Sequence, residues 1–369
     1  MKAGGSAIEE APDDMKAKLT NALVLTLSLR AIGVQAQPAQ PLTVGKAVPV
    51  TVDNFNRAES DLQFHEAVKD GGFGKFAHYR DPVAIGNQPV VRPNRDMLYS
   101  IGVFDLDAGP VMITLPDAGN RFRSMQVIDE DQYTLAVNYG AGDYTFTKET
   151  IGTRYDLIAV RILVDAENTD DIGQVHLLQD AIKVSQKSAG SFETPNWDQV
   201  SQKMVRNALL ALASTVPKTT RMFGTRDQVD PVHHLIGTAL GWGGNPEKAA
   251  LYLDFTTNKN DGNTIYRLRI RDVPVDGFWS ISVYNAQGYF QPNERDAYTL
   301  NNVTAKKSED GSIVVQFGGC DGEIPNCLPT VSGWSYTVRL YRPRTEILDG
   351  KWTFPEATAV DQSTEFASP

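Results

Sequence analysis

Two guanidiniums, an amide, a carboxylate and a phenol lie in one short run of the chain, Arg92-Pro-Asn94-Arg95-Asp96-Met-Leu-Tyr99. The run precedes a predicted strand, where an Arg–Asp pair can hold a polar ligand through two parallel hydrogen bonds. We predict that Arg92, Asn94 and Arg95 bind a ligand. Asp96 and Tyr99 are predicted to take part in catalysis. The same side chains would also suit a buried network that fixes the entry of the strand, and both interpretations stay open.

One histidine stands close upstream of this run, in His78-Tyr-Arg-Asp-Pro82. Imidazole titrates near neutral pH, which suits it to general acid and base catalysis. We therefore expect His78 to face the same pocket as Asp96 and Tyr99.

Motifs for metals and cofactors are absent from the sequence. It contains no His-Glu-x-x-His, no P-loop, no dinucleotide-binding glycine motif and no Gly-x-Ser-x-Gly. His233 and His234 are adjacent, so on a helix they point about 100° apart and are poorly placed to share a metal. Asp129-Glu-Asp131 could bind Ca²⁺ or form a solvated acidic turn. We predict no metal and no cofactor. Whether the turn at 129–131 binds Ca²⁺ and whether the protein is an enzyme both stay open.

The composition predicts many short strands around these residues. The 369 residues are 41% hydrophobic and 22% charged, as in globular proteins, and 30 glycines and 20 prolines interrupt the chain too often for long helices to dominate. Strand-length runs rich in β-branched and aromatic residues fall at 97–104, 111–115, 122–128, 133–139, 144–146 and 157–164, and again at 252–257, 264–270, 278–284, 313–317 and 335–341. Helical spacing is found at 54–68, 177–184, 197–212 and 231–240.

The second group of strands echoes the first. Leu115–Asp129 aligns with Val273–Asn285, preserving Pro, Gly, Phe, Ser and Val in order, and Ile158–Ile162 aligns with Tyr336–Leu340. Each match is short, and coincidence between two turn-and-strand units is the alternative. Two landmarks in the same order nevertheless predict two related β domains.

The N-terminal segment resembles a secretory signal. Met15-Lys-Ala-Lys18 is basic, Ala22–Leu29 is apolar, and Val34-Gln-Ala36 has the small residues that signal peptidase requires, so cleavage is expected after Ala36. An amphipathic helix that stays on the protein is the alternative. In the periplasm or outside the cell, Cys320 and Cys327 are expected to form a disulfide.

The net charge and the aromatic residues indicate which kinds of molecule the protein could bind. A net charge of −10 argues against nucleic acid, because binding a phosphate backbone needs a concentrated basic face. Aromatic residues mixed with arginines over 279–344 would suit stacking on a sugar or an aromatic ligand, or else fill the inner faces of a sandwich. We expect a small-molecule or glycan ligand and no transmembrane segment in the mature protein.

The quoted motifs resemble a known family. Arg92–Ser100 and Leu115–Phe122 resemble the bacterial domain of unknown function 1254, whereas Phe278–Asn285 and Tyr336–Pro343 resemble its usual partner, domain of unknown function 1214. The resemblance implies two jelly-roll-like antiparallel β-sandwich domains, in outline similar to double jelly-roll capsid proteins. It also makes a homo-oligomer, and a trimer in particular, a reasonable expectation. It implies no activity, because fold does not fix function.

We therefore expect a mainly β protein with four parts: an N-terminal extension and signal peptide (1–36), an N-terminal β domain (37–176), a helical connector (177–250) and a C-terminal β domain (251–369). The favoured function is that of an exported ligand-binding or self-assembling protein. The alternative is a periplasmic hydrolase or lyase that acts on a small polar or glycan-like substrate.

Overall fold

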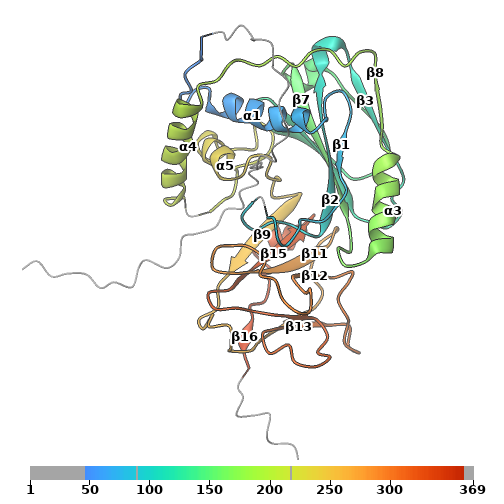
Figure 1. The fold of residues 1–369 in the computed structure, drawn as a ribbon, viewed down its shortest axis with the longest axis vertical. Helices are drawn as coiled ribbons and strands as arrows, with labels where there is room; N and C mark the ends of the chain where they lie inside the picture. Colours follow the sequence, from blue (N-terminus) through green and yellow to red (C-terminus); the bar gives the residue numbers. More distant parts are fainter. Residues whose placement is uncertain (1–45, 89, 217, 361–369) are drawn as a thin grey trace, which may run out of the picture.

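The structure, a computed structural model, describes residues 46–88, 90–216 and 218–360. The predicted signal peptide, with its cleavage after Ala36, lies outside these residues. Over the described ranges the chain forms sixteen strands, gathered into four sheets, and six α-helices. The prediction of a mainly β protein with antiparallel sheets is confirmed. Figure 1 shows the sheets as two stacked groups, with helices beside the upper group.

The upper group consists of two antiparallel sheets that share one apolar core. Phe104, Ile113, Val127 and Ile158 point into this core because side chains alternate between the two faces of a strand. The first sheet has the order β1 (Ala77–Tyr79), β2 (Met97–Asp105), β7 (Tyr155–Leu163), β4 (Arg123–Asp129), β5 (Thr134–Asn138), and the second has the order β6 (Gly142–Phe146), β3 (Val111–Leu115), β8 (Lys183–Gln186). Two short helices, η1 (Leu106–Ala108) and α2 (Lys148–Ile151), lie in the connections.

The lower group also has two sheets around one core. Their orders are β14 (Cys327–Leu328), β13 (Ile313–Phe317), β10 (Tyr266–Ile270), β16 (Thr358–Ala359), and β12 (Thr299–Asn301), β11 (Trp279–Tyr284), β15 (Ser335–Tyr341), β9 (Ala250–Phe255). The helix α6 (Thr345–Leu348) follows β15. Trp279, Trp334 and Tyr336 are buried in this core, so aromatic residues here fill the inner faces of the sheets. The predicted disulfide between Cys320 and Cys327 is present.

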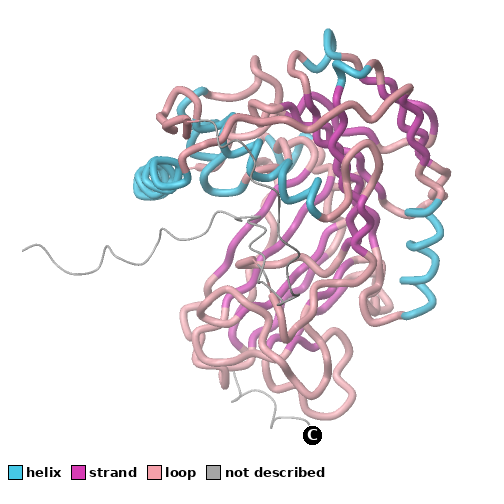
Figure 2. The backbone as a smooth tube through the Cα atoms, turned by 45° about the horizontal axis from the view of Figure 1, so that its top comes forward, coloured by secondary structure: helices cyan, strands magenta, loops and turns pink. Residues whose placement is uncertain are grey.

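Three helices cover the outer face of the five-stranded sheet. They are α1 (Phe55–Lys69), α4 (Gln199–Ala213) and α5 (Pro231–Gly241), which contact one another. Phe64 of α1 and Trp242 after α5 pack on Tyr155 and Leu157 of β7, which attaches the helices to the sheet. Figure 2 shows these helices on one side of the strands and α3 (Thr169–Asp180) on the other. Because the helices cover one face of β7 and the second sheet covers the other, the strand is buried along its whole length.

The structure corrects the helix predicted over 177–184. Asn168 accepts hydrogen bonds from the N–H groups of Asp170 and Asp171, so α3 begins earlier, at Thr169. The chain leaves the helix after Asp180, and β8 then pairs with β3. The apolar positions of 177–184 are divided between a helix end and an edge strand.

The sequence repeat occupies equivalent places in the two groups. Ser124 of β4 lies opposite Arg161 of β7, and their aligned counterparts, Ser280 of β11 and Arg339 of β15, lie opposite each other in the same way. The residue two positions after each arginine donates its N–H to the carbonyl of a phenylalanine, at 3.0 and 2.9 Å. The short sequence matches therefore reflect a shared arrangement of strands.

Arg339 joins the two groups. Its side chain is fully buried, and its Nη1 donates to Oγ of Ser282 at 2.8 Å. Its Nη2 donates to the carbonyls of Arg92 (3.0 Å) and Pro93 (3.3 Å) and to the phenol of Tyr284 (2.7 Å). The loop before β2, which belongs to the upper group, is thereby fixed on the lower one.

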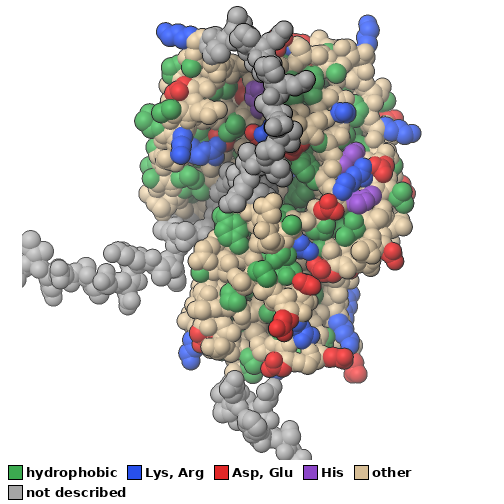
Figure 3. Space-filling model, viewed as in Figure 1, with side chains coloured by type: hydrophobic (Ala, Val, Ile, Leu, Met, Phe, Trp, Pro, Cys, Tyr) green, Lys and Arg blue, Asp and Glu red, His purple; other side chains and the backbone are tan. Residues whose placement is uncertain are grey.

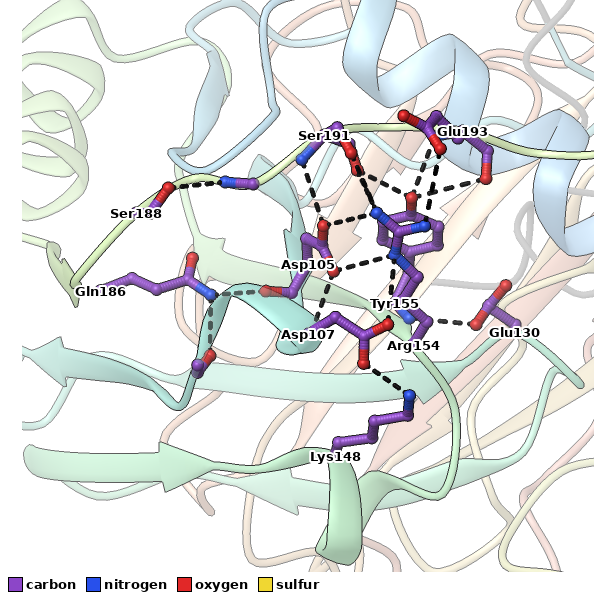
Figure 4. A network of polar contacts seen from close by, with 12 residues as sticks. Asp105, Asp107, Glu130, Lys148, Arg154, Tyr155, Gln186, Ser188, Ser191 and Glu193 are labelled. Atoms are coloured by element: carbon purple, nitrogen blue, oxygen red, sulfur yellow. Dashed lines mark hydrogen bonds and ion pairs between the residues drawn. The ribbon is translucent and has the colours of Figure 1, made fainter.

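A second network holds the segment that runs from β8 to α4 (Figure 4). Asp105, 2% exposed, accepts hydrogen bonds from Nε and Nη2 of Arg154 (3.1 and 2.9 Å) and from the N–H of Ser191 (3.1 Å). The hydroxyl of Tyr155 donates to the carbonyl of Ser191 at 2.7 Å. Burial alone would raise the pKa of Asp105, but the bonds from Arg154 and from the N–H groups of Ser191 and Asp107 hold it below its usual value.

The depressed pKa of Asp105 predicts a loss of stability in acid. A carboxyl whose pKa is lower in the folded state contributes stability above its unfolded pKa of about 3.9, and this stability is lost as the pH falls through the folded value. We expect Asp105→Asn to cost about 2 kcal/mol at pH 7, and the difference from wild type to shrink toward pH 3. Melting temperatures between pH 3 and 7 measure this.

Asp107→Asn is the matched control, because the Asp107 carboxylate is exposed and pairs with Lys148 at the surface. We expect it to cost less than about 1 kcal/mol. Equal losses in the two variants, or a loss in Asp105→Asn that does not depend on pH, would contradict the assigned role.

The two equivalent arginines predict unequal effects on folding. Arg339→Gln leaves two buried carbonyls and a phenol without their donor, so we expect a loss of more than about 2 kcal/mol in the free energy of unfolding. Arg161→Gln removes one short hydrogen bond to Gln126 and is expected to cost about 1 kcal/mol or less. Urea unfolding followed by tryptophan fluorescence compares the two, and a larger loss for Arg161→Gln would refute the comparison.

Candidate functional site

A cavity of about 120 Å³ lies where the upper sheet, the helices and the lower group meet. Its walls come from β2 and β7, from the loop at 219–223, from the turn after α5 and from β9 and β15. Gly243 in that turn has φ +74°, a left-handed conformation that glycine adopts without strain. We call this space the central cavity.

Among the described residues, Arg161 is, with Arg92, one of two buried arginines in the wall of the central cavity. Alternation along β7 places Leu157, Ala159 and Arg161 on the face that the helices cover, and Arg161 is 6% exposed. Its Nη1 donates to Oε1 of Gln126 at 2.7 Å, whereas its Nη2 reaches only the carbonyl of Gly243, at 3.5 Å. It forms no ion pair with any carboxylate in the described part of the chain. A buried guanidinium in this state lacks a negative counterpart.

Phenols and amides surround this guanidinium. The Tyr99 ring lies 5.6 Å from it. Asn245 donates to the phenol of Tyr252 at 2.8 Å, and Asn94 donates to the phenol of Tyr341 at 2.9 Å. Burial raises the pKa of both phenols, that of Tyr341 well above its usual value, so both are neutral and can donate a hydrogen bond.

Three of the predicted residues line the central cavity: Arg92, Asn94 and Tyr99. The guanidinium of Arg92 is engaged by the protein itself, with Oδ1 of Asp254 at 3.0 Å and Oγ1 of Thr337 at 2.6 Å. Asn94 accepts the N–H of Asp96 while it donates to Tyr341. The partners of the Arg92 guanidinium thus come from the protein itself.

Arg95 and Asp96 lie in a different hollow, between 164–167 and 295–304. Arg95 pairs with Glu167 at 2.8 Å and lies over the Tyr298 ring. Asp96 is 1% exposed and accepts from Oγ1 of Thr299 at 3.1 Å; burial raises the pKa of its carboxyl. The two predicted residues therefore fix the segment before β2, Asp96 on β12 and Arg95 on Glu167 and Tyr298.

His78 does not face the central cavity, contrary to our expectation. In the β1–β2 ladder His78 lies opposite Ser100 and Tyr79 lies opposite Tyr99, so His78 and Tyr99 are on opposite faces of the sheet. Nδ1 of His78 lies 2.7 Å from Oγ of Ser100, and burial lowers its pKa. The structure does not bring His78, Asp96 and Tyr99 together, and their catalytic roles stay predictions.

The acidic turn at 129–131 is held by the protein's own groups. Oδ1 of Asp129 accepts the N–H groups of Asp131 (2.9 Å) and Tyr133 (2.8 Å), and Asp131 pairs with Arg57 at 2.8 Å. Burial raises the pKa of Asp129 to about 7. Among the described residues no group of three or more His, Cys, Asp or Glu side chains is arranged to hold a metal.

Sequence reasoning missed Arg161, Asn245 and Tyr252 as site residues, and it included Tyr341 only among the aromatic residues over 279–344. A signal for Arg161 was present, because it is the one basic residue in the strand Tyr-Asp-Leu-Ile-Ala-Val-Arg-Ile-Leu, which is otherwise largely apolar. A lone charge in a buried strand needs a specific partner. The other three come from β9, β15 and the turn after α5, and only the fold brings them to β7.

Comparison with known proteins identifies the two halves. Residues 73–186 match the model described as "Protein of unknown function (DUF1254)" and residues 248–345 match "Protein of unknown function (DUF1214)". No curated protein matches the chain.

Two solved structures resemble this one. The VPA0106 protein from Vibrio parahaemolyticus has 18% identity and a TM-score of 0.67, with 84% of this chain and 98% of that chain covered. A putative uncharacterized protein from Burkholderia cenocepacia has 12% identity and a TM-score of 0.48, with 84% and 87% covered. The first likeness shows a shared fold. With both family matches in the predicted order, the chain belongs to the family of proteins in which a DUF1254 domain is followed by a DUF1214 domain.

Proposed function

We propose that this is an exported protein that binds a small molecule with one acidic group in the central cavity, where Arg161 holds the acid. Export is supported by the disulfide between Cys320 and Cys327 and by the sequence pattern before Ala36. No helix in the described residues is long and apolar enough to span a membrane. We retain the division into two jelly-roll-like domains, 37–176 and 251–369, with a helical connector as part of the proposal.

The observation that carries the proposal is the charge of Arg161. Removing a guanidinium from water costs several kcal/mol unless a partner compensates it. Arg92, in the same wall, has Asp254 as its partner, whereas Arg161 has two neutral oxygens and open space. A ligand carboxylate would supply the missing charge and accept two parallel hydrogen bonds.

The neutral groups around Arg161 support binding of an acid. The phenols of Tyr252 and Tyr341 each accept an amide hydrogen and retain their own hydrogen to donate. These donors and Arg161 favour an acceptor-rich ligand over a cationic one. On the face shown in Figure 3 basic side chains are scattered among acidic ones, so that face presents no concentrated basic surface for a nucleic acid.

The alternative function, a hydrolase or lyase, has less support. Glu247 is the one carboxylate among the described residues that line the central cavity, and no histidine or cysteine is among them. Oε1 of Glu247 accepts the N–H of Arg221, which gives that carboxylate a structural partner. Assembly into a homotrimer stays a second expectation, for which light scattering is the direct measurement.

Binding of benzoate and benzamide tests the proposal. The two molecules have similar shapes, but only benzoate carries the charge. We expect millimolar benzoate to raise the melting temperature of the wild type and benzamide to have no such effect. In Arg161→Gln we expect benzoate to bind at least about tenfold more weakly, because a charged hydrogen-bond pair is lost.

Arg269→Gln is the control variant, because Arg269 is an exposed arginine of β10, outside the cavity. It should bind benzoate as the wild type does. If no carboxylate binds to the wild type, or if Arg161→Gln binds benzoate with undiminished affinity, the proposed function is wrong.

A further inference from the structure

The two repeats allow Arg161 to be compared with its counterpart Arg339, whose Nη2 has several acceptors although its buried Nε has none. In both repeats Nη1 of the arginine donates to a side chain of the neighbouring strand: Arg339 to Ser282 and Arg161 to Gln126, at equivalent positions of β11 and β4. The Nη2 atoms differ. Nη2 of Arg339 has three oxygen acceptors, whereas Nη2 of Arg161 has only the distant carbonyl of Gly243.

The acceptors of Arg339 come mainly from the Arg92-Pro93 loop, which lies on the lower sheet as a ligand would. Polar side chains of that sheet receive the loop: Tyr284 donates to the carbonyl of Pro93, while Thr337 and Ser335 accept from the side chain of Arg92. Among the described residues no loop supplies Arg161 with such acceptors: the turn after α5 brings only the Gly243 carbonyl, 3.5 Å from Nη2, and the central cavity lies beside it.

The upper sheet replaces each of these polar side chains with an apolar one. In the alignment of the repeats, Ile128 stands for Tyr284, Leu157 for Ser335 and Ala159 for Thr337. All three line a second hollow, of about 30 Å³, together with Trp242. Tyr99, Arg161 and Gly243 line both this hollow and the central cavity. The surface beside Arg161 is therefore suited to hydrocarbon, whereas the equivalent surface beside Arg339 is suited to peptide.

We infer that the ligand is a small monocarboxylic acid with an apolar body: its carboxylate takes the place at Nη2 of Arg161 that the Arg92 and Pro93 carbonyls take at Arg339, and its hydrocarbon enters the hollow formed by Ile128, Leu157 and Ala159. Arg161 is the one arginine of the cavity wall without an ion pair in the described residues, so a ligand with a single negative charge would balance it. This inference rests on the proposed function and extends it, because anion binding at Arg161 alone would not require the hollow.

Acetate, butanoate and hexanoate, titrated by calorimetry into the full chain, test the role of the hollow. Burying hydrocarbon stabilises by about 0.8 kcal/mol per methylene, which corresponds to about a fourfold gain in affinity for each one buried. We expect affinity to rise along the series in the wild type. Hexanamide, the neutral analogue, is expected to bind at least tenfold more weakly than hexanoate.

Ile128→Tyr places in the hollow the side chain that the other repeat has there. We expect it to weaken hexanoate at least tenfold and acetate by a smaller factor, because the new phenol can also accept from Nη2 of Arg161, as Tyr284 does from Arg339. Ala159→Thr, a smaller change at the position of Thr337, should weaken hexanoate in the same direction and keeps the test available if Ile128→Tyr does not fold. Val303→Tyr, at an exposed position away from both cavities, is the control and should bind like the wild type.

The outcomes separate the two proposals. If acids bind and Arg161→Gln abolishes binding, but affinity is flat along the series or unaffected by Ile128→Tyr and Ala159→Thr, the inference about the hollow is wrong and the proposed function stands. If no acid binds, or if Arg161→Gln leaves the affinity for acids unchanged, both the proposed function and the inference about the hollow are wrong. Rising affinity that the hollow variants reduce selectively supports both.

Discussion

The burial of one guanidinium in a central strand of each β group is the constraint on which the structure depends. Arg161 and Arg339 lie at the same place in β7 and β15, opposite serines of the neighbouring strands. A charge at such a place must be given acceptors by whatever covers the sheet. Arg339 is covered by the Arg92-Pro93 loop, which comes from the other half of the chain. The arginine therefore links the two groups of sheets.

The cover of Arg161 is a layer of helices, and it leaves the guanidinium incompletely satisfied. Trp242 and Phe64 fix that layer on the sheet, while the glycine turn after α5 crosses above the arginine. Gly244 in this turn packs on the Phe223 ring so closely that a Cβ atom there would lie 2.4 Å from it. Because the glycines of the turn carry no side chain, the turn lies close to the sheet there without filling the central cavity.

The same duplication serves two purposes. In the lower group, Ser335, Thr337 and Tyr284 make a polar surface that the chain itself occupies, and this holds the molecule together. In the upper group, apolar residues at the equivalent positions leave a surface that no described segment occupies. Two repeats of one arrangement of strands thus differ in what covers them, which is a structural contact in the lower group and the proposed binding site in the upper group.

Much of the fold could be predicted from the sequence, because it rests on local patterns. The helix at 54–68, the strands around 97–104 and 157–164, the repeat and the disulfide were all indicated by spacing and composition. The helix over 177–184 was misplaced because a strong cap at Asn168 and an edge strand share those apolar positions.

The site was predicted only in part. Tyr99 and Asn94 line the central cavity, and their predicted roles stay predictions. His78 is on the far face of its sheet because strand register, which the sequence did not supply, decides the face of every side chain. The sequence places Arg161 in the repeat, but its missing acceptors depend on what covers each sheet, which only the fold shows.

The most direct test of the central claim is a crystal structure of the protein grown with hexanoate. The account predicts a carboxylate within hydrogen-bond distance of Nη2 of Arg161, with the alkyl chain against Ile128, Leu157 and Ala159. Hexanoate bound elsewhere, or Nη2 of Arg161 paired with a carboxylate of the protein's own chain, would contradict it.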